Sequence, residues 1–267
     1  MDAWTYEGHA GQVAARVWRG VDHPRYVAVL VHGYGEHIGR YEWVAATLGA
    51  HGAVVYGLDH AGHGQSEGER VLVRDYDDVV ADLHQLVSSA RADHPDVPVI
   101  MIGHSMGGLI ATRYAQLHAA ELTALVLSGP VLGSWAVVDD LLPQDPIPPT
   151  PIDPGTLSRD PEIGRIYADD PLVWHGDFRR ETLEALNTAM ARITEHGSLG
   201  DLPVLYLHGE DDRLVPIGPS QAGVAAVAGP ATESGTYPGA QHEIFNETNK
   251  EEVLRDVTAF VDRVLPG

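Results

Sequence analysis

The chain has 267 residues, of which 44% are hydrophobic and 21% are charged, and this is the composition of a folded protein of one large or two small domains. Its 17 Lys and Arg against 38 Asp and Glu leave a net charge of −21, which repels phosphate backbones and anionic bilayers. We therefore expect no nucleic-acid partner. The absence of cysteine excludes disulfides, thiolate metal sites and a cysteine nucleophile.

The first 18 residues have no basic start followed by an apolar run, and no apolar stretch is long enough to span a bilayer. We expect no signal peptide and no transmembrane segment. A cytoplasmic protein is the interpretation that follows.

Short, continuous apolar runs predict the strands of a sheet. Residues that are apolar without alternation are typical of parallel strands buried on both faces. The runs occupy residues 27–31, 53–58, 98–102, 122–127 and 203–207, with a further strand-like segment at 231–237.

Amphipathic helical patterns alternate with these runs. Residues 75–90 place Val79 and Leu83 on one face, with Asp77, Asp78 and Asp82 on the opposite, solvent face. Residues 249–264 repeat the pattern. Strands that alternate with helices predict an α/β fold with a mostly parallel central sheet flanked by helices.

The alternation stops after residue 131. Six prolines lie between Pro143 and Pro154, which excludes a helix interior or a central strand there, and helices are predicted at 160–168 and 178–195. A long surface loop is the simpler interpretation. We favour a cap (lid) over residues 132–199, inserted into a core of residues 1–131 and 200–267. Its apolar side chains are expected to line an acyl pocket: Leu141, Leu142, Ile147, Trp174 and Leu183.

The segment Gly103-His104-Ser105-Met106-Gly107 carries the strongest chemical signal. It follows a predicted strand and precedes a predicted helix, which is the context that the G-x-S-x-G pattern of serine hydrolases requires. The glycines permit a sharp turn that exposes the Ser105 hydroxyl at the positive end of the helix. The alternative is a tight turn with an incidental serine.

A serine nucleophile needs a base, and in this arrangement an acid and then a histidine follow it along the chain. The segment at 208–216 begins where a predicted strand ends and contains Glu210, Asp211 and Asp212. We choose Asp212 as the acid, although the physics alone does not separate it from Asp211. His242 is the base, because it is the only histidine beyond residue 212.

The turn His32-Gly33-Tyr34-Gly35-Glu36-His37 ends the first apolar run. It can direct the Tyr34 amide at the nucleophile, and with the Met106 amide this makes a two-donor oxyanion hole. The alternative is a simple turn whose histidines pack or hydrogen-bond locally, and we expect that role for His32 and His37.

Asp59, His60 and His63 are potential metal ligands that occur close to the same turn in the predicted fold. Their spacing matches no ligand pattern for a transition metal. Residues 59–64 are better interpreted as a turn held by local hydrogen bonds, and we expect neither a metal nor a cofactor.

Three segments together resemble the monoacylglycerol lipases of the α/β-hydrolase fold. They are residues 32–41, the run Asp59-His60-Ala61-Gly62-His63-Gly64-Gln65-Ser66-Glu67-Gly68, and Gly103-His104-Ser105-Met106-Gly107-Gly108. The last occurs in many esterases, whereas the first two are far more specific. The similarity extends from about Val27 to the last helix, including residues 157–159 and 167–172 in the cap.

The resemblance implies a serine hydrolase that cleaves monoacylglycerols to fatty acid and glycerol through an acyl-enzyme intermediate, beneath a mobile apolar cap. It implies Ser105, Asp212 and His242 as the triad, with the oxyanion hole as above. Glu36 and Arg40 match residues of a polar subsite for glycerol. An ion pair that braces the oxyanion loop is the equal alternative for these two.

Two departures from the family pattern stand out. Phe245 occupies a position where better-known relatives carry a second histidine, which puts part of the glycerol recognition in doubt. Relatives also have cysteines around the acyl tunnel, so their inhibition by thiol-directed reagents should not extend to this chain.

Other enzymes and binding proteins share this scaffold. Ser105 argues against haloalkane dehalogenases and epoxide hydrolases, which place Asp at that position. A short-chain carboxylesterase keeps the same triad and is the closest rival, whereas a ligand-binding protein without turnover is a weaker one. The expected partner is a small lipid ester, with at most transient membrane or micelle contact through the cap. The oligomeric state stays open.

Overall fold

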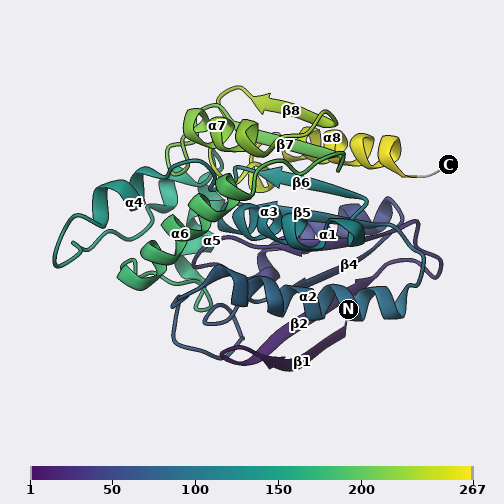
Figure 1. The fold of residues 1–267 in the computed structure, drawn as a ribbon, viewed down its shortest axis with the longest axis horizontal. Coiled ribbons are helices and arrows are strands. Elements are labelled where there is room, and N and C mark those ends of the chain that lie inside the picture. The colour runs from purple at the N-terminus through teal and green to yellow at the C-terminus, as the bar shows by residue number, and fades with distance from the viewer. Residues whose placement is uncertain (1, 266–267) are drawn as a thin grey trace.

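The computed structural model describes residues 2–265, and its centre is one sheet of eight strands in the order β1-β2-β4-β3-β5-β6-β7-β8 (Figure 1). The strands from β3 to β8 pair in parallel. Their bounds are β1 Asp2–Gly8, β2 Gly11–Arg19, β3 Tyr26–Val31, β4 Ala53–Leu58, β5 Val99–His104, β6 Ala124–Ser128, β7 Val204–Gly209 and β8 Thr232–Tyr237. The predicted mostly parallel sheet is confirmed.

Two strands were missed by the sequence analysis. β1 and β2 form an antiparallel hairpin, and β2 pairs antiparallel with β4 at the end of the sheet. Only alternate residues of β2 are buried, namely Val13, Ala15 and Val17, so the segment lacks the continuous apolar run used to find the other strands. The signal present was alternation with a period of two.

Helices cover both faces of the sheet. α1 (Glu42–Ala50) and α8 (Lys250–Val264) pack on one face, and α2 (Tyr76–Asp93), α3 (Met106–His118) and α7 (Ile217–Val227) pack on the other. β3 shows why a central strand is apolar throughout. Val27, Val29 and Val31 join the core on one face, and Ala28 and Leu30 join the core on the other.

The predicted solvent face of α2 is wrong at one position. Asp82 is 3% exposed, because the turn between β1 and β2 folds over the helix at that point. Its carboxylate accepts hydrogen bonds from the His9 backbone amide at 3.0 Å and pairs with His9 Nδ1 at 2.6 Å. Asp82 is buried because it binds the β1–β2 turn, and the helical pattern of residues 75–90 contains no sign of that contact.

No strand occurs between β6 and β7. The segment contains α4 (Ala136–Leu141), η3 (Pro154–Thr156), α5 (Pro161–Asp169) and α6 (Arg180–His196), and Figure 1 shows the three α-helices gathered at one end of the sheet, opposite the last turn of α8. The remaining 3-10 turns are η1 (Ile38–Tyr41), η2 (Ala119–Glu121) and η4 (Ile244–Asn246). The predicted helices at 160–168 and 178–195 therefore shift by one or two residues.

Candidate active site

Ser105 lies on a sharp turn between β5 and α3. Its backbone has φ +57° and ψ −122°, a conformation that residues other than glycine rarely adopt. The turn is possible only because two glycines flank it. A Cβ on Gly107 would lie 2.1 Å from the Val31 carbonyl oxygen, and one on Gly103 would lie 2.4 Å from the Gly107 carbonyl oxygen. The strained turn places Ser105 in the wall of a pocket.

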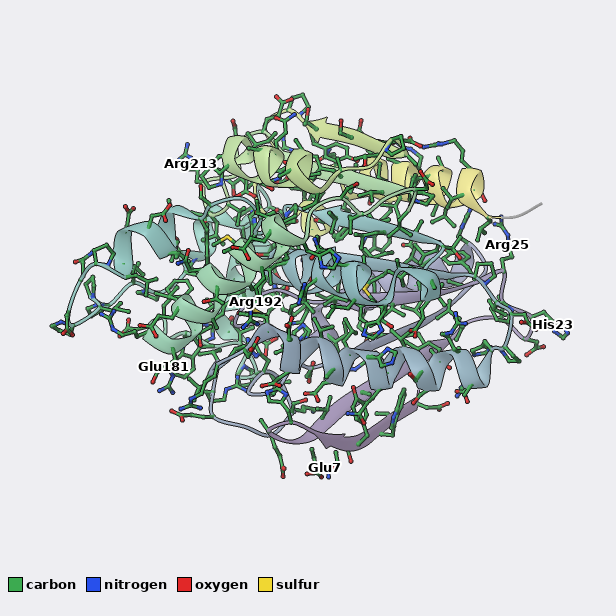
Figure 2. All side chains as sticks on the ribbon, viewed as in Figure 1. Glu7, His23, Arg25, Glu181, Arg192 and Arg213 are labelled. Carbon is green, nitrogen blue, oxygen red and sulfur yellow. The ribbon has the colours of Figure 1, made fainter. Side chains whose placement is uncertain are left out.

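Asp212 and His242 meet where β7 and β8 end. His242 Nδ1 lies 2.7 Å from Asp212 Oδ2, and Asp212 Oδ1 accepts hydrogen bonds from the Leu214 and Val215 amides at 3.0 and 2.8 Å. Glu210 and Asp211 are exposed and take no part in this arrangement. Figure 2 shows the neighbouring Arg213 pointing outward from the molecule. Asp212 alone of the three acidic residues lies beside the histidine.

The pair has the charge distribution that a general base needs. Burial opposes ionisation of Asp212, but the His242 charge and hydrogen bonds from His208 and His242 outweigh it, so the pKa of Asp212 falls well below its usual range. Burial alone would lower the pKa of His242, yet the Asp212 carboxylate raises it above 6.5. An ionised carboxylate only accepts, so Nδ1 carries the imidazole proton and Nε2 is free to accept another.

The oxyanion loop lies against the nucleophile. A Cβ on Gly33 would lie 3.1 Å from Ser105 Cβ, which places the Tyr34 peptide beside the hydroxyl. Within residues 2–265, the Tyr34 and Met106 amides donate no hydrogen bond to another protein group. Both residues belong to segments that line the pocket, and Met106 begins α3, where the helix dipole is positive.

Glu36 and Arg40 form a buried network beneath this loop. Glu36 Oε1 accepts from the Gly33 amide and from the Tyr41 hydroxyl, each at 2.7 Å, while Arg40 donates to Glu36 Oε2 at 2.7 Å. The guanidinium also binds both oxygens of Glu243 at 2.7 and 2.8 Å. Both carboxylate oxygens of Glu36 are thus engaged by the protein, an arrangement that favours bracing of the loop over direct contact with substrate.

The histidines beside this loop, for which the sequence predicts a turn rather than a metal site, form hydrogen bonds with the backbone. His32 Nδ1 lies 2.8 Å from the Gly33 carbonyl and its Nε2 accepts from the His60 amide at 3.1 Å. Asp59 accepts from the Ile38 and Gln65 amides at 2.8 Å each, as a turn requires. Burial lowers the pKa of His63 to about 4, so this histidine is neutral at pH 7.

His37 differs from the local role expected of it. It does cap the η1 turn through Gly39, but its Nε2 lies 2.8 Å from Asp170 Oδ2, a residue of the segment after α5. The contact joins the oxyanion loop to the predicted cap.

A pocket lies beside Ser105 and is lined by both polar and apolar side chains. Its polar wall comes from Glu36, Arg40 and Glu243. Its apolar wall is not the one predicted: Leu183 and Leu141 pack into the core instead, because α6 packs on α2 and α3 and α4 packs on α6. The apolar lining consists of Trp135, Ile152, Leu157, Tyr167 and Leu214. Phe245 lines an adjoining hollow that shares the polar wall.

A second set of contacts, missed by the sequence analysis, ties the His242 loop to the predicted cap. Glu247 Oε1 accepts from the Gln241 and Arg159 amides at 2.8 and 3.0 Å, and Oε2 accepts from Arg159 Nε at 2.9 Å. The Glu243 amide donates to the Leu157 carbonyl at 2.7 Å. Residues 157–159 and 241–247 therefore form one hydrogen-bonded seam. The only sequence signal was that residues 157–159 belong to the family resemblance.

Comparison with known proteins identifies the family to which the chain belongs. The family model described as "Serine aminopeptidase, S33" matches residues 22–249. The monoacylglycerol lipase of Mycolicibacterium smegmatis is 40% identical over 254 residues, which cover 92% of this chain and 91% of that protein. The chain belongs to the monoacylglycerol lipase family. It is therefore an ester hydrolase, and the family resemblance in its sequence is confirmed.

Other members of the monoacylglycerol lipase family lie further away in sequence but share the fold. Human monoglyceride lipase is 35% identical over 211 residues, covering 74% of this chain and 69% of that protein. The crystal structure of the Paleococcus ferrophilus monoacylglycerol lipase has a TM-score of 0.80 at 26% identity, covering 99% of this chain and all of that one. The α/β-hydrolase fold is thereby confirmed. No helix within residues 2–265 combines the length and apolarity needed to cross a membrane.

Proposed function

We propose that the enzyme hydrolyses monoacylglycerols to a fatty acid and glycerol through an acyl-enzyme on Ser105. The pairing of Asp212 with His242 in one pocket with Ser105 supports this proposal most directly. The names of the relatives support the substrate class, and the polar wall next to the apolar one suits an ester with a hydroxylated head group.

In the proposed reaction His242 Nε2 takes the proton of the Ser105 hydroxyl as the oxygen attacks the ester carbonyl. The resulting oxyanion is stabilised by the Tyr34 and Met106 amides. The imidazolium then protonates the glycerol oxygen, which leaves. Water repeats the sequence on the acyl-enzyme, and Asp212 holds the imidazole in the required tautomer throughout.

The proposed division into a core of residues 1–131 and 200–267 and a cap of residues 132–199 fits this scheme. Trp135, Ile152, Leu157 and Tyr167 all come from the cap and line the pocket. Apolar groups at this place provide contact for an acyl chain, which gains about 0.8 kcal/mol for each methylene moved out of water. Transient contact of the cap with a micelle or membrane would deliver such a substrate.

The experiment that tests the function is a panel of monoacylglycerols, diglycerides and simple esters at several acyl lengths, each measured as kcat/KM. We expect kcat/KM to rise with acyl length until the pocket is full, and to be higher for a monoacylglycerol than for the methyl ester of the same acid. A steady fall from the shortest esters upward would instead identify a short-chain carboxylesterase.

A further inference from the structure

A buried histidine that the proposed reaction does not use lies behind Asp212. His208 occupies the carboxyl end of β7, four residues before Asp212, and its side chain is fully buried. It does not line the pocket; Asp212 separates it from His242.

The contacts of His208 determine its protonation. Its Nε2 lies 2.8 Å from the Val215 carbonyl oxygen and 3.2 Å from Asp212 Oδ2, and its Nδ1 lies 2.8 Å from the Tyr206 hydroxyl. Since a carbonyl and a carboxylate only accept, Nε2 carries a proton, while the Tyr206 hydroxyl occupies Nδ1. His208 therefore presents an N–H to Asp212.

This donor completes the environment of the carboxylate. Oδ1 of Asp212 accepts from two backbone amides of its own loop, and Oδ2 pairs with His242 Nδ1 at 2.7 Å and lies 3.2 Å from His208 Nε2. The bond to Val215 fixes the same loop from the other side. Without His208, Oδ2 would keep only the proton that it shares with His242, and the Val215 carbonyl would be buried without its donor.

We propose that His208 is a positioning residue for the reaction. Its Nε2–H donates to Asp212 Oδ2 and to the Val215 carbonyl, and this holds the carboxylate and its loop in place against His242. The inference rests on the proposed function only in taking Asp212 and His242 as the working pair, and it requires no particular ester.

The test compares His208→Leu with His208→Gln, using a p-nitrophenyl ester as the substrate. Leucine fills much of the volume without a donor, whereas glutamine places an N–H near the position of Nε2. For His208→Leu we expect kcat to fall on the order of 10–100-fold near neutral pH with little change in KM, because an interaction with a charged group is lost. His208→Gln should stay within about threefold of the wild type.

The pH dependence separates positioning from simple loss of stability. The groups that face His242 are Asp212, His104, Glu36 and Glu243. With one donor fewer, Oδ2 binds the imidazole proton more strongly, so the ascending limb of kcat/KM in His208→Leu should move to higher pH and the deficit should shrink in alkali. The proton on His242 Nδ1, observed by NMR, should shift in His208→Leu and return in His208→Gln.

Three results would overturn the inference: wild-type kcat and pH profile in His208→Leu, a loss in His208→Leu that is uniform at every pH, or a His208→Gln variant as impaired as His208→Leu. Thermal unfolding of each variant shows that the measured proteins are folded. Failure of the proposed function is recognised separately, because wild-type enzyme would then neither turn over the ester nor react at Ser105 with a serine-directed phosphonate.

Discussion

Ser105 stands in a backbone conformation that the surrounding glycines impose rather than one that its own side chain favours. Replacement by alanine removes the hydroxyl and leaves the turn unchanged. We expect Ser105→Ala to lose on the order of 10⁶ in kcat while its melting temperature stays close to that of the wild type. Turnover measured with and without a serine-directed reagent checks this, and a variant that keeps near wild-type rates would disprove the mechanism.

Asp212 and Asp211 are adjacent and chemically identical, but only Asp212 reaches His242. Asp212→Asn replaces an accepting oxygen by a donor or turns the imidazole, and a change of this kind costs about 10⁴ in kcat in a comparable triad. Asp211→Asn alters an exposed charge and should change kcat little. Steady-state kinetics of the matched pair decide the assignment, which is off by one residue if Asp211→Asn is the inactive variant.

Glu36 tests the two interpretations of the polar network. Because its oxygens are bound by Gly33, Tyr41 and Arg40, we expect Glu36→Gln to loosen the oxyanion loop and to reduce kcat/KM about equally for a monoacylglycerol and for the methyl ester of the same acid. The ratio of the two losses is the measurement. A loss confined to the monoacylglycerol would assign Glu36 to the head group.

The elements were predicted where they are continuous and apolar, and missed where burial is one-sided. Residues 53–58 coincide with β4 because both faces of that strand are covered. The hairpin of β1 and β2 was missed because an edge hairpin needs only one buried face. The same hairpin brings His9 to Asp82, a contact between segments 73 residues apart that no local pattern contains.

The strength of the contact between His9 of this hairpin and Asp82 of α2 should depend on pH. The hydrogen bond to Asp82 raises the pKa of His9 above 6.5, so its contribution to stability is present below that value and is lost as the pH rises through the raised pKa. We expect His9→Gln to lower the free energy of unfolding by about 1–3 kcal/mol at pH 6 and by less at pH 9. Urea unfolding of both proteins at pH 6 and pH 9 checks this. If the free energies of unfolding of the wild type and His9→Gln differ by the same amount at both pH values, the charge of His9 does not contribute.

The whole molecule keeps several histidines neutral in its interior. Burial lowers the pKa of His63 and of His104 to about 4, and burial also holds the pKa of His32 and of His60 well below 6.5. The unfolded chain therefore binds more protons than the native one between about pH 6.5 and pH 4. Stability should fall as the pH drops through this range, by roughly 1.4 kcal/mol per pH unit for each such histidine.

His9 and His242 have raised pKa values and therefore stabilise the native state as the pH falls. They are two against the four buried histidines whose pKa values are lowered. Urea midpoints at pH 7 and pH 5 give the measurement, and removing one buried histidine as His63→Asn should flatten the curve. A midpoint that does not change between the two pH values would contradict the prediction.

The sequence was sufficient for the fold class and for choosing the residues that the structure brings together around the pocket. Ser105, Asp212 and His242 follow strand ends, and strand ends of a parallel sheet meet at one edge. It was insufficient for the lining of the pocket. Whether Leu183 or Leu157 lines the pocket depends on how the segments of the proposed cap pack against the sheet and its helices, and both residues are equally apolar in the sequence.

The seam between residues 157–159 and 241–247 restricts how the product can leave the active site. Glu247 accepts hydrogen bonds from the backbone amides of Arg159 and Gln241, which lie on the two sides of that seam. Gln241 directly precedes His242. If the proposed cap moved away at this seam, it would displace His242 from Ser105. The acyl-enzyme would then lack the general base that activates water for its hydrolysis. In the proposed mechanism, the fatty acid must therefore leave the pocket while the hydrogen bonds of this seam stay intact.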